Sequence, residues 1–119
     1  MSPDQAMSWV RGFRVHVYET EGRVIVECHG KLTSENAPLL KEEMRAMIPQ
    51  RKSIVLDLKE VPLMDSAGLG TVVGLFVTGR TRGCRIELVN ANRQIRDLFS
   101  LTNLLTLFEP AGRHGGKMI

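Results

Sequence analysis

The residues with the clearest capacity for chemistry lie in one short segment, residues 61–70, which reads VPLMDSAGLG. It follows an apolar run and precedes a long stretch of small and apolar residues, so we expect it to join a buried strand to a helix. Such junctions hold the ligand sites of open α/β sheets, and helix N–H groups attract negative charge there. Its carboxylate and hydroxyl, Asp65 and Ser66, are therefore the first candidates for catalysis, anion binding or helix capping.

A catalytic serine would need partners that this pattern does not supply. The nucleophile elbow G-x-S-x-G requires glycine at position 64, which is Met64, and only Gly68 matches. His16 and His29 are expected on hairpin strands, and nothing in their spacing points to Ser66. We therefore expect no enzymatic activity, and we interpret both histidines as ordinary strand residues.

The glycines of the segment complete no nucleotide-binding motif. A P-loop needs a lysine after its second glycine, and none follows Gly70. Residues 68–73 approach the pattern G-x-G-x-x-G, but Val73 stands where the third glycine belongs. Two readings stay open at this point: weak binding of a nucleotide or other anion, and a structural role in which Asp65 or Ser66 caps the helix.

The two cysteines, Cys28 and Cys84, stand far apart in the sequence and form no C-x-x-C pair. This spacing predicts no zinc site, and in a chain without a signal sequence it is typical of reduced thiols. We expect neither a metal nor a cofactor.

The elements that must position residues 61–70 follow from the hydrophobic pattern. Two β-branched runs on either side of Gly22 predict a hairpin that begins at Phe13. The polar residues 33–36 and Pro38 predict a helix start, and Pro49 stops that helix. Its expected buried face consists of Ala37, Leu40, Met44, Met47 and Ile48.

The second half of the chain alternates strands and helices. Residues 53–58 predict a strand that is buried on both faces, 66–77 a buried helix, and 85–89 a further strand. Asn90 or Asn92 is expected to cap a third helix, and residues 105–108 predict a last strand. The third helix should bury Ile95, Leu98, Phe99 and Thr102. The order β-β-α-β-α-β-α-β predicts an α/β fold with a mixed sheet and helices mainly on one face.

Length and composition are those of one domain. The chain has 119 residues, of which 43% are hydrophobic and 24% charged, and its net charge is +3. No block of like charge predicts direct nucleic-acid binding, and no apolar run is long enough for a membrane span. The N-terminus lacks the pattern of a secretory signal, so we expect a cytoplasmic protein. We expect an N-terminal arm over 1–12, the domain over 13–109 and a flexible tail over 110–119.

The string Met-Asp-Ser-Ala-Gly-Leu-Gly (residues 64–70), after an Ile-Val-Leu-Asp-Leu strand, resembles the signature of STAS domains. Residues 13–109 resemble bacterial anti-sigma factor antagonists, with Gly30-Lys31-Leu32 and residues 95–104 as further matches. The resemblance implies a STAS-like fold and a protein–protein switch in transcription regulation. In that family the serine after the aspartate is phosphorylated by a partner serine kinase of the histidine-kinase-like ATPase type, which is also the anti-sigma factor. That position is Ser66.

The resemblance also implies which residues meet the partner, and it predicts no catalytic residues, no cofactor and a monomer or weak dimer. Thr33 and Asp65 would line the kinase-facing rim beside Ser66. The next residues would shape the contact helix: Gly68, Leu69 and Gly70.

Two features depart from the family pattern. The frequent aspartate after the G-x-L segment is Thr33 here, so a kinase contact through that carboxylate is missing. The closing C-terminal helix of many relatives has no counterpart in this sequence. The alternative function is a ligand-sensing or transporter-accessory STAS module, which is not phosphorylated.

Overall fold

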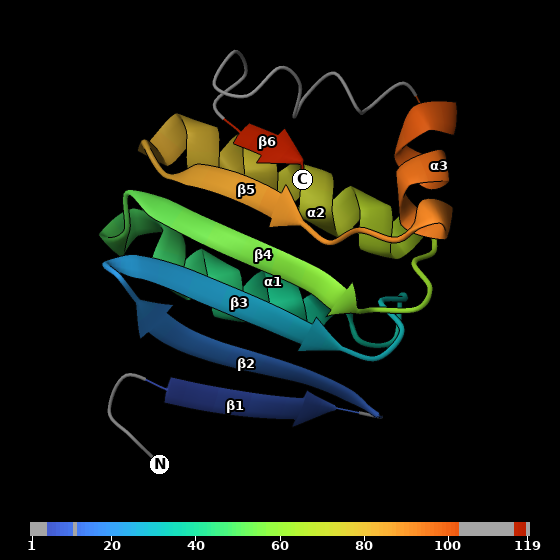
Figure 1. Ribbon diagram of the computed structural model, residues 1–119, viewed down its shortest axis with the longest axis horizontal. Coiled ribbons are helices and arrows are strands. Elements are labelled where there is room, and N and C mark those ends of the chain that lie inside the picture. Colours follow the sequence, from blue (N-terminus) through green and yellow to red (C-terminus); the bar gives the residue numbers. More distant parts are fainter. Residues whose placement is uncertain (1–4, 11, 103–115, 119) are drawn as a thin grey trace.

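A six-stranded mixed sheet forms one layer of the protein, and helices α1 and α2 lie against one of its faces (Figure 1). The computed structural model describes residues 5–10, 12–102 and 116–118. The sheet order is β1(Gln5–Val10), β2(Phe13–Thr20), β3(Arg23–His29), β4(Ser53–Glu60), β5(Arg85–Val89) and β6(Gly116–Met118). The pairs β1–β2 and β2–β3 are antiparallel, and the other neighbours are parallel. The α/β fold class with a mixed sheet is confirmed.

The hairpin β2–β3 closes through a turn at Glu21 and Gly22, both with positive φ (52° and 78°). Two such residues match the right-handed twist of the flanking strands, as in type I′ turns. Alternate residues of both strands, such as Val15 and Val26, are buried toward the helices. The opposite face of these two strands carries polar side chains, among them His16 and Glu27.

The helices connect the parallel strands. They are α1(Ala37–Met47), followed by the short 3-10 turn η1(Ile48–Gln50), then α2(Ser66–Arg82) and α3(Arg93–Leu101). Helix α1 buries the expected Ala37, Leu40 and Met44, and Pro49 lies within η1, where the helix ends. Helix α3 lies at the end of the sheet where the carboxyl ends of β4 and β5 are found (Figure 1). None of the helices in the described residues is long and apolar enough to cross a membrane.

Helix α2 runs five residues beyond the predicted end at residue 77. It ends at Gly83, whose left-handed backbone (φ 76°) closes the helix. Gly79 lies on the buried face of this extension, and a Cβ there would come within 2.8 Å of the Cys84 carbonyl oxygen. The glycine therefore permits a close approach of the helix to β5 and does not interrupt the helix.

Two strands occupy segments that are predicted to lie outside the domain. Residues 5–10 of the predicted arm form β1, which pairs with β2. Residues 116–118 of the predicted flexible tail form β6, which pairs with β5. Backbone hydrogen bonds at a sheet edge require no particular side-chain pattern, which explains why the sequence pattern predicts neither strand. The strand predicted over 105–108 lies outside the described residues.

Candidate functional site

Two loops meet where β3 and β4 end, and they bring the predicted site residues together. Leu32 and Met64 pair as an isolated parallel bridge between these loops. The N–H of Leu32 donates to the Leu63 carbonyl (2.9 Å), and the N–H of Asp65 donates to the Leu32 carbonyl (3.2 Å). The segment that holds Thr33 is thereby fixed to the segment that leads into Ser66.

Asp65 is the cap of helix α2, which decides between the two candidates left by the sequence. Its Oδ1 accepts from the N–H of Gly68 (2.9 Å), and its Oδ2 accepts from the N–H of Ser34 in the other loop (3.2 Å). The carboxylate thus satisfies a free donor of the first helical turn and joins the loops. Ser66 is the first helical residue and is exposed, and its hydroxyl has no hydrogen-bond partner among the described residues. The hydroxyl is available to another molecule.

The other predicted site residues differ in exposure. Gly70 is exposed and Thr33 is half-buried, so both can reach a partner. Gly68 and Leu69 are buried, and Leu69 packs into the core with 6% of its surface exposed. A Cβ at Gly68 would lie 2.3 Å from the Leu32 carbonyl oxygen. These two residues therefore shape the site from beneath and offer no side chain to a partner.

The loop around Thr33 is held by Asn36, a buried polar residue with 5% of its surface exposed. Its Oδ1 accepts from the N–H of Thr33 (2.8 Å), and its Nδ2 donates to the Lys31 carbonyl (2.6 Å). The sequence marks Asn36 only as part of a helix start. The side chain makes no cap hydrogen bond to α1 and fixes the preceding loop.

Helix α3 supports the Ser66 loop through two amide side chains. The Oε1 of Gln94 accepts from the N–H of Met64 (3.0 Å), and its Nε2 donates to the carbonyl of the same residue (3.1 Å). Asn92 caps α3, as the sequence allowed, and its Nδ2 also donates to the Pro62 carbonyl (3.1 Å). Local sequence patterns do not predict this role of Gln94, because its partner Met64 lies 30 residues away along the chain.

We expect Gln94→Ala to lower the free energy of unfolding by about 1–3 kcal/mol, since both polar groups of Met64 lose their partner. Arg93→Ala is the matched control. The Arg93 side chain is 94% exposed, and its ion pair with Asp97 spans 3.8 Å, so its loss should cost less than about 0.5 kcal/mol. Urea unfolding and hydrogen exchange at the Met64 amide measure the two effects. Equal losses in both variants would mean that the amide bridge does not stabilise the loop.

His16 and His29 lie on β2 and β3, as expected, and both face Glu27. Nε2 of His29 is 3.0 Å and Nδ1 of His16 is 3.9 Å from Oε1 of Glu27, and the hydroxyl of Tyr18 donates to Oε2 (2.9 Å). Burial raises the pKa of Glu27, but the hydrogen bonds from His29 and Tyr18 and the imidazole charges outweigh it, so the pKa is lowered. His16 and His29 thus belong to a polar cluster centred on Glu27.

Because the pKa of Glu27 is lower in the folded than in the unfolded chain, its carboxylate stabilises the fold above the unfolded pKa. This stabilisation is lost as the pH falls below about 4.5, the ordinary value for the group. We expect Glu27→Gln to cost about 1–2 kcal/mol at pH 7 and clearly less at about pH 3. Urea unfolding at both pH values checks this, with the exposed Glu42→Gln as control. A cost that is the same at both pH values would refute the assignment.

Both cysteines are buried, Cys28 on β3 and Cys84 before β5. Burial raises the pKa of each thiol, so the reactive thiolate is disfavoured in the folded chain. Their surroundings are those of packing residues.

With this geometry in place, comparison with known families matches the STAS domain over residues 14–115. The chain belongs to the STAS domain family. The anti-sigma-B factor antagonist of Bacillus subtilis (strain 168) is 29% identical over 102 residues, which cover 86% of this chain and 94% of that protein.

Solved structures agree on the STAS fold. An anti-sigma factor antagonist from Mycobacterium paratuberculosis superposes with a TM-score of 0.71 at 21% identity, covering 91% of this chain and 86% of that one. The Bacillus cell fate determinant SpoIIAA in its phosphorylated form has a TM-score of 0.62 at 18% identity, covering 97% of this chain and 90% of that one. At these identities the structures bear on the fold alone.

Proposed function

We propose that this STAS domain is an anti-sigma factor antagonist that binds its anti-sigma factor until Ser66 is phosphorylated. The observation that carries the proposal is the exposed Ser66 hydroxyl at the first position of α2, with the cap supplied by Asp65. The hydroxyl is therefore accessible to a kinase and is not needed to hold the helix. The B. subtilis relative bears the name of an anti-sigma-B factor antagonist, which supports the same role.

The proposed partner is an anti-sigma factor that is also a serine kinase of the histidine-kinase-like ATPase type. Thr33, Asp65, Ser66 and Gly70 form the surface offered to it, and Gly68 and Leu69 set the position of the helix below. The domain would act in the cytoplasm, as a monomer or weak dimer, and would be a substrate without catalytic residues of its own.

The switch follows from charge at one position. A phosphate adds about 1.5–2 negative charges to Ser66, and the N-terminus of α2 stabilises that charge by about 0.3–1 kcal/mol. The phosphorylated domain should therefore stay folded. At the centre of an interface the same charge must be desolvated beside the Asp65 carboxylate, which opposes binding. A penalty of about 3 kcal/mol would weaken binding about a hundredfold without refolding.

The test is phosphate transfer from ATP. The purified chain would capture partners from lysate of its host with and without ATP, and mass spectrometry would locate phosphate on the recovered chain. We expect a histidine-kinase-like ATPase that is released as Ser66 becomes phosphorylated. Stable capture of transporter subunits with Ser66 unmodified would overturn the proposal and support the transporter-accessory alternative.

A further inference from the structure

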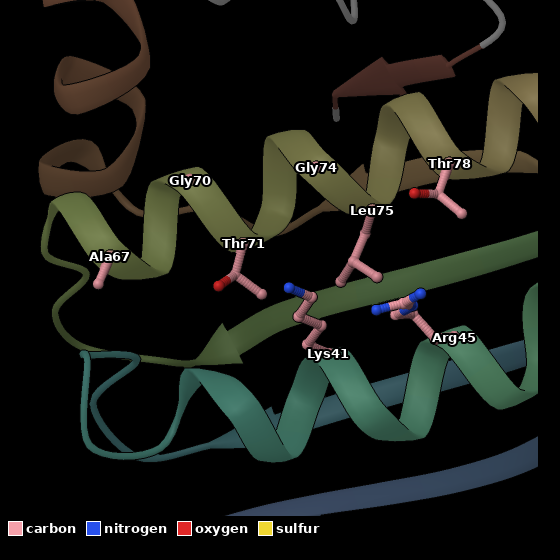
Figure 2. A pocket seen from close by; sticks show the side chains of 8 residues that line it. All are labelled: Lys41, Arg45, Ala67, Gly70, Thr71, Gly74, Leu75 and Thr78. Carbon is pink, nitrogen blue, oxygen red and sulfur yellow. The ribbon is translucent and has the colours of Figure 1, made fainter.

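A groove of ≈ 450 Å³ runs between helices α1 and α2 and begins one residue after Ser66 (Figure 2). Helix α1 contributes Lys41 and Arg45, whose side chains point toward α2 (Figure 2). Helix α2 contributes residues from Ala67 to Thr78, which span about 16 Å of helix. The groove is therefore elongated, and one end of it adjoins the proposed phosphorylation site.

On the α2 side, few bulky side chains project into the groove. A Cβ at Gly70 or Gly74 would meet nothing within 4 Å, so both glycines leave open space above the helix. The hydroxyl-bearing side chains of Thr71 and Thr78 lie along the same side (Figure 2). The surface can thus accept a bulky segment and supply hydrogen-bond donors to it.

The two charged side chains that line the groove are both positive, and Glu42 lies outside it, in an adjoining hollow that Lys41 and Arg45 also line. Lys41 and Arg45 are exposed and one helical turn apart, and neither forms an ion pair with any residue that the structure describes. No acidic residue lines the groove, and helix α2 contains none. Other arginines of the domain do have carboxylate partners, such as Arg23 with Glu87.

We propose that this groove binds an acidic helix of the partner, with carboxylates four residues apart that pair with Lys41 and Arg45. Cations at positions i and i+4 of one helix complement carboxylates at the same spacing on another. The length of the groove favours a peptide segment over a small anion, which would need only one end of it. The inference rests on the proposed function, because it names the chemistry of the partner at that same surface.

The proposal also gives phosphorylation a second effect. A phosphate on Ser66 would stand at the end of a groove that holds carboxylates, and like charges repel. Phosphorylation would then weaken binding of the acidic helix as well as the contact at Ser66 itself.

The probe is an alanine-based helical peptide of about 15 residues with glutamates four residues apart, compared with its glutamine counterpart. We expect the glutamate peptide to bind at least tenfold more tightly than the glutamine peptide and to shift the backbone amides of Lys41, Arg45 and Thr71 in NMR spectra. Lys41→Glu/Arg45→Glu should reduce its affinity to that of the glutamine peptide. The control Lys52→Glu/Arg82→Glu makes the same charge change outside the groove, at the residue before β4 and at the last residue of α2, and should keep the affinity within about threefold.

Thermal melting of both double variants would verify that each is folded. Equal affinity for the two peptides, or an equal loss in both double variants, would overturn the proposal. Shifts caused by inorganic phosphate but not by the glutamate peptide would identify a small-anion site and would also overturn it. The peptide titration does not depend on whether Ser66 can be phosphorylated. Failure of the peptide with successful phosphorylation rejects the groove alone, and the reverse result rejects the phosphorylation switch alone.

Discussion

Ser66→Asp is expected to weaken binding of the anti-sigma partner by about ten- to a hundredfold while the melting temperature stays close to that of the wild type. Aspartate adds about one negative charge, less than a phosphate, at the exposed first position of α2. A carboxylate in the first turn is compatible with the helix, so the loss should lie in binding and not in folding. Titration calorimetry with the recovered kinase and thermal melting measure the two quantities separately.

Ser66→Ala should keep the affinity of the unmodified protein and prevent its phosphorylation, which makes it a constantly active antagonist. Because Asp65 caps the helix, removal of the Ser66 hydroxyl should cost less than the 0.5–2 kcal/mol typical of a lost cap. Asp65→Ala is the control that should incur that cost, since it also frees the N–H of Ser34. If Ser66→Asp binds as tightly as the wild type and only Ser66→Ala loses stability, Ser66 is structural and the switch is wrong.

The parts of the fold that the sequence predicts well are those that local patterns determine. The strand over residues 85–89 is confirmed to the residue, because its side chains alternate between buried and more exposed positions. The run that begins at residue 66 is confirmed as a helix, and Asp65 directly before it supplies the cap. Local spacing also identifies Asn92 as one of two candidate caps of α3.

The contacts that build the site join residues that lie far apart in the chain, and local sequence patterns do not predict such contacts. Gln94 bonds Met64, and Asp65 bonds Ser34, across separations of 30 and 31 residues. Each of these side chains is polar and unremarkable in its own segment. Only the parallel pairing of β3 with β4, and the position of α3 beyond it, bring the pairs together.

The roles of the glycines in α2 divide in the same way. The sequence does not distinguish them, yet in the structure Gly68 and Gly79 approach other backbone segments closely and Gly70 and Gly74 have open space beside them. The difference depends on which face of the helix meets the Leu32 loop and β5. The helical period alone does not say which glycine meets backbone and which meets solvent.

Gly68→Ala is expected to lower the free energy of unfolding by about 3 kcal/mol and the melting temperature by roughly 10 °C. The added Cβ would lie 2.3 Å from the Leu32 carbonyl oxygen and 2.8 Å from Cγ of Met64. The Met64 side chain can move aside, but the carbonyl also accepts from the N–H of Asp65. Relief of the clash must therefore separate the two loops that hold the site.

Gly74→Ala is the matched control on the same helix. Its Cβ would meet nothing within 4 Å, so the higher helix propensity of alanine should stabilise the protein by about 0.5–1 kcal/mol. Urea unfolding of both variants gives the comparison, and phosphorylation of Ser66 reports on the site. If Gly68→Ala does not fold, its single-residue contrast with a stabilised Gly74→Ala still locates the cause at the Leu32 contact. If Gly68→Ala is as stable as Gly74→Ala and is phosphorylated at the wild-type rate, the close contact with Leu32 does not position Ser66.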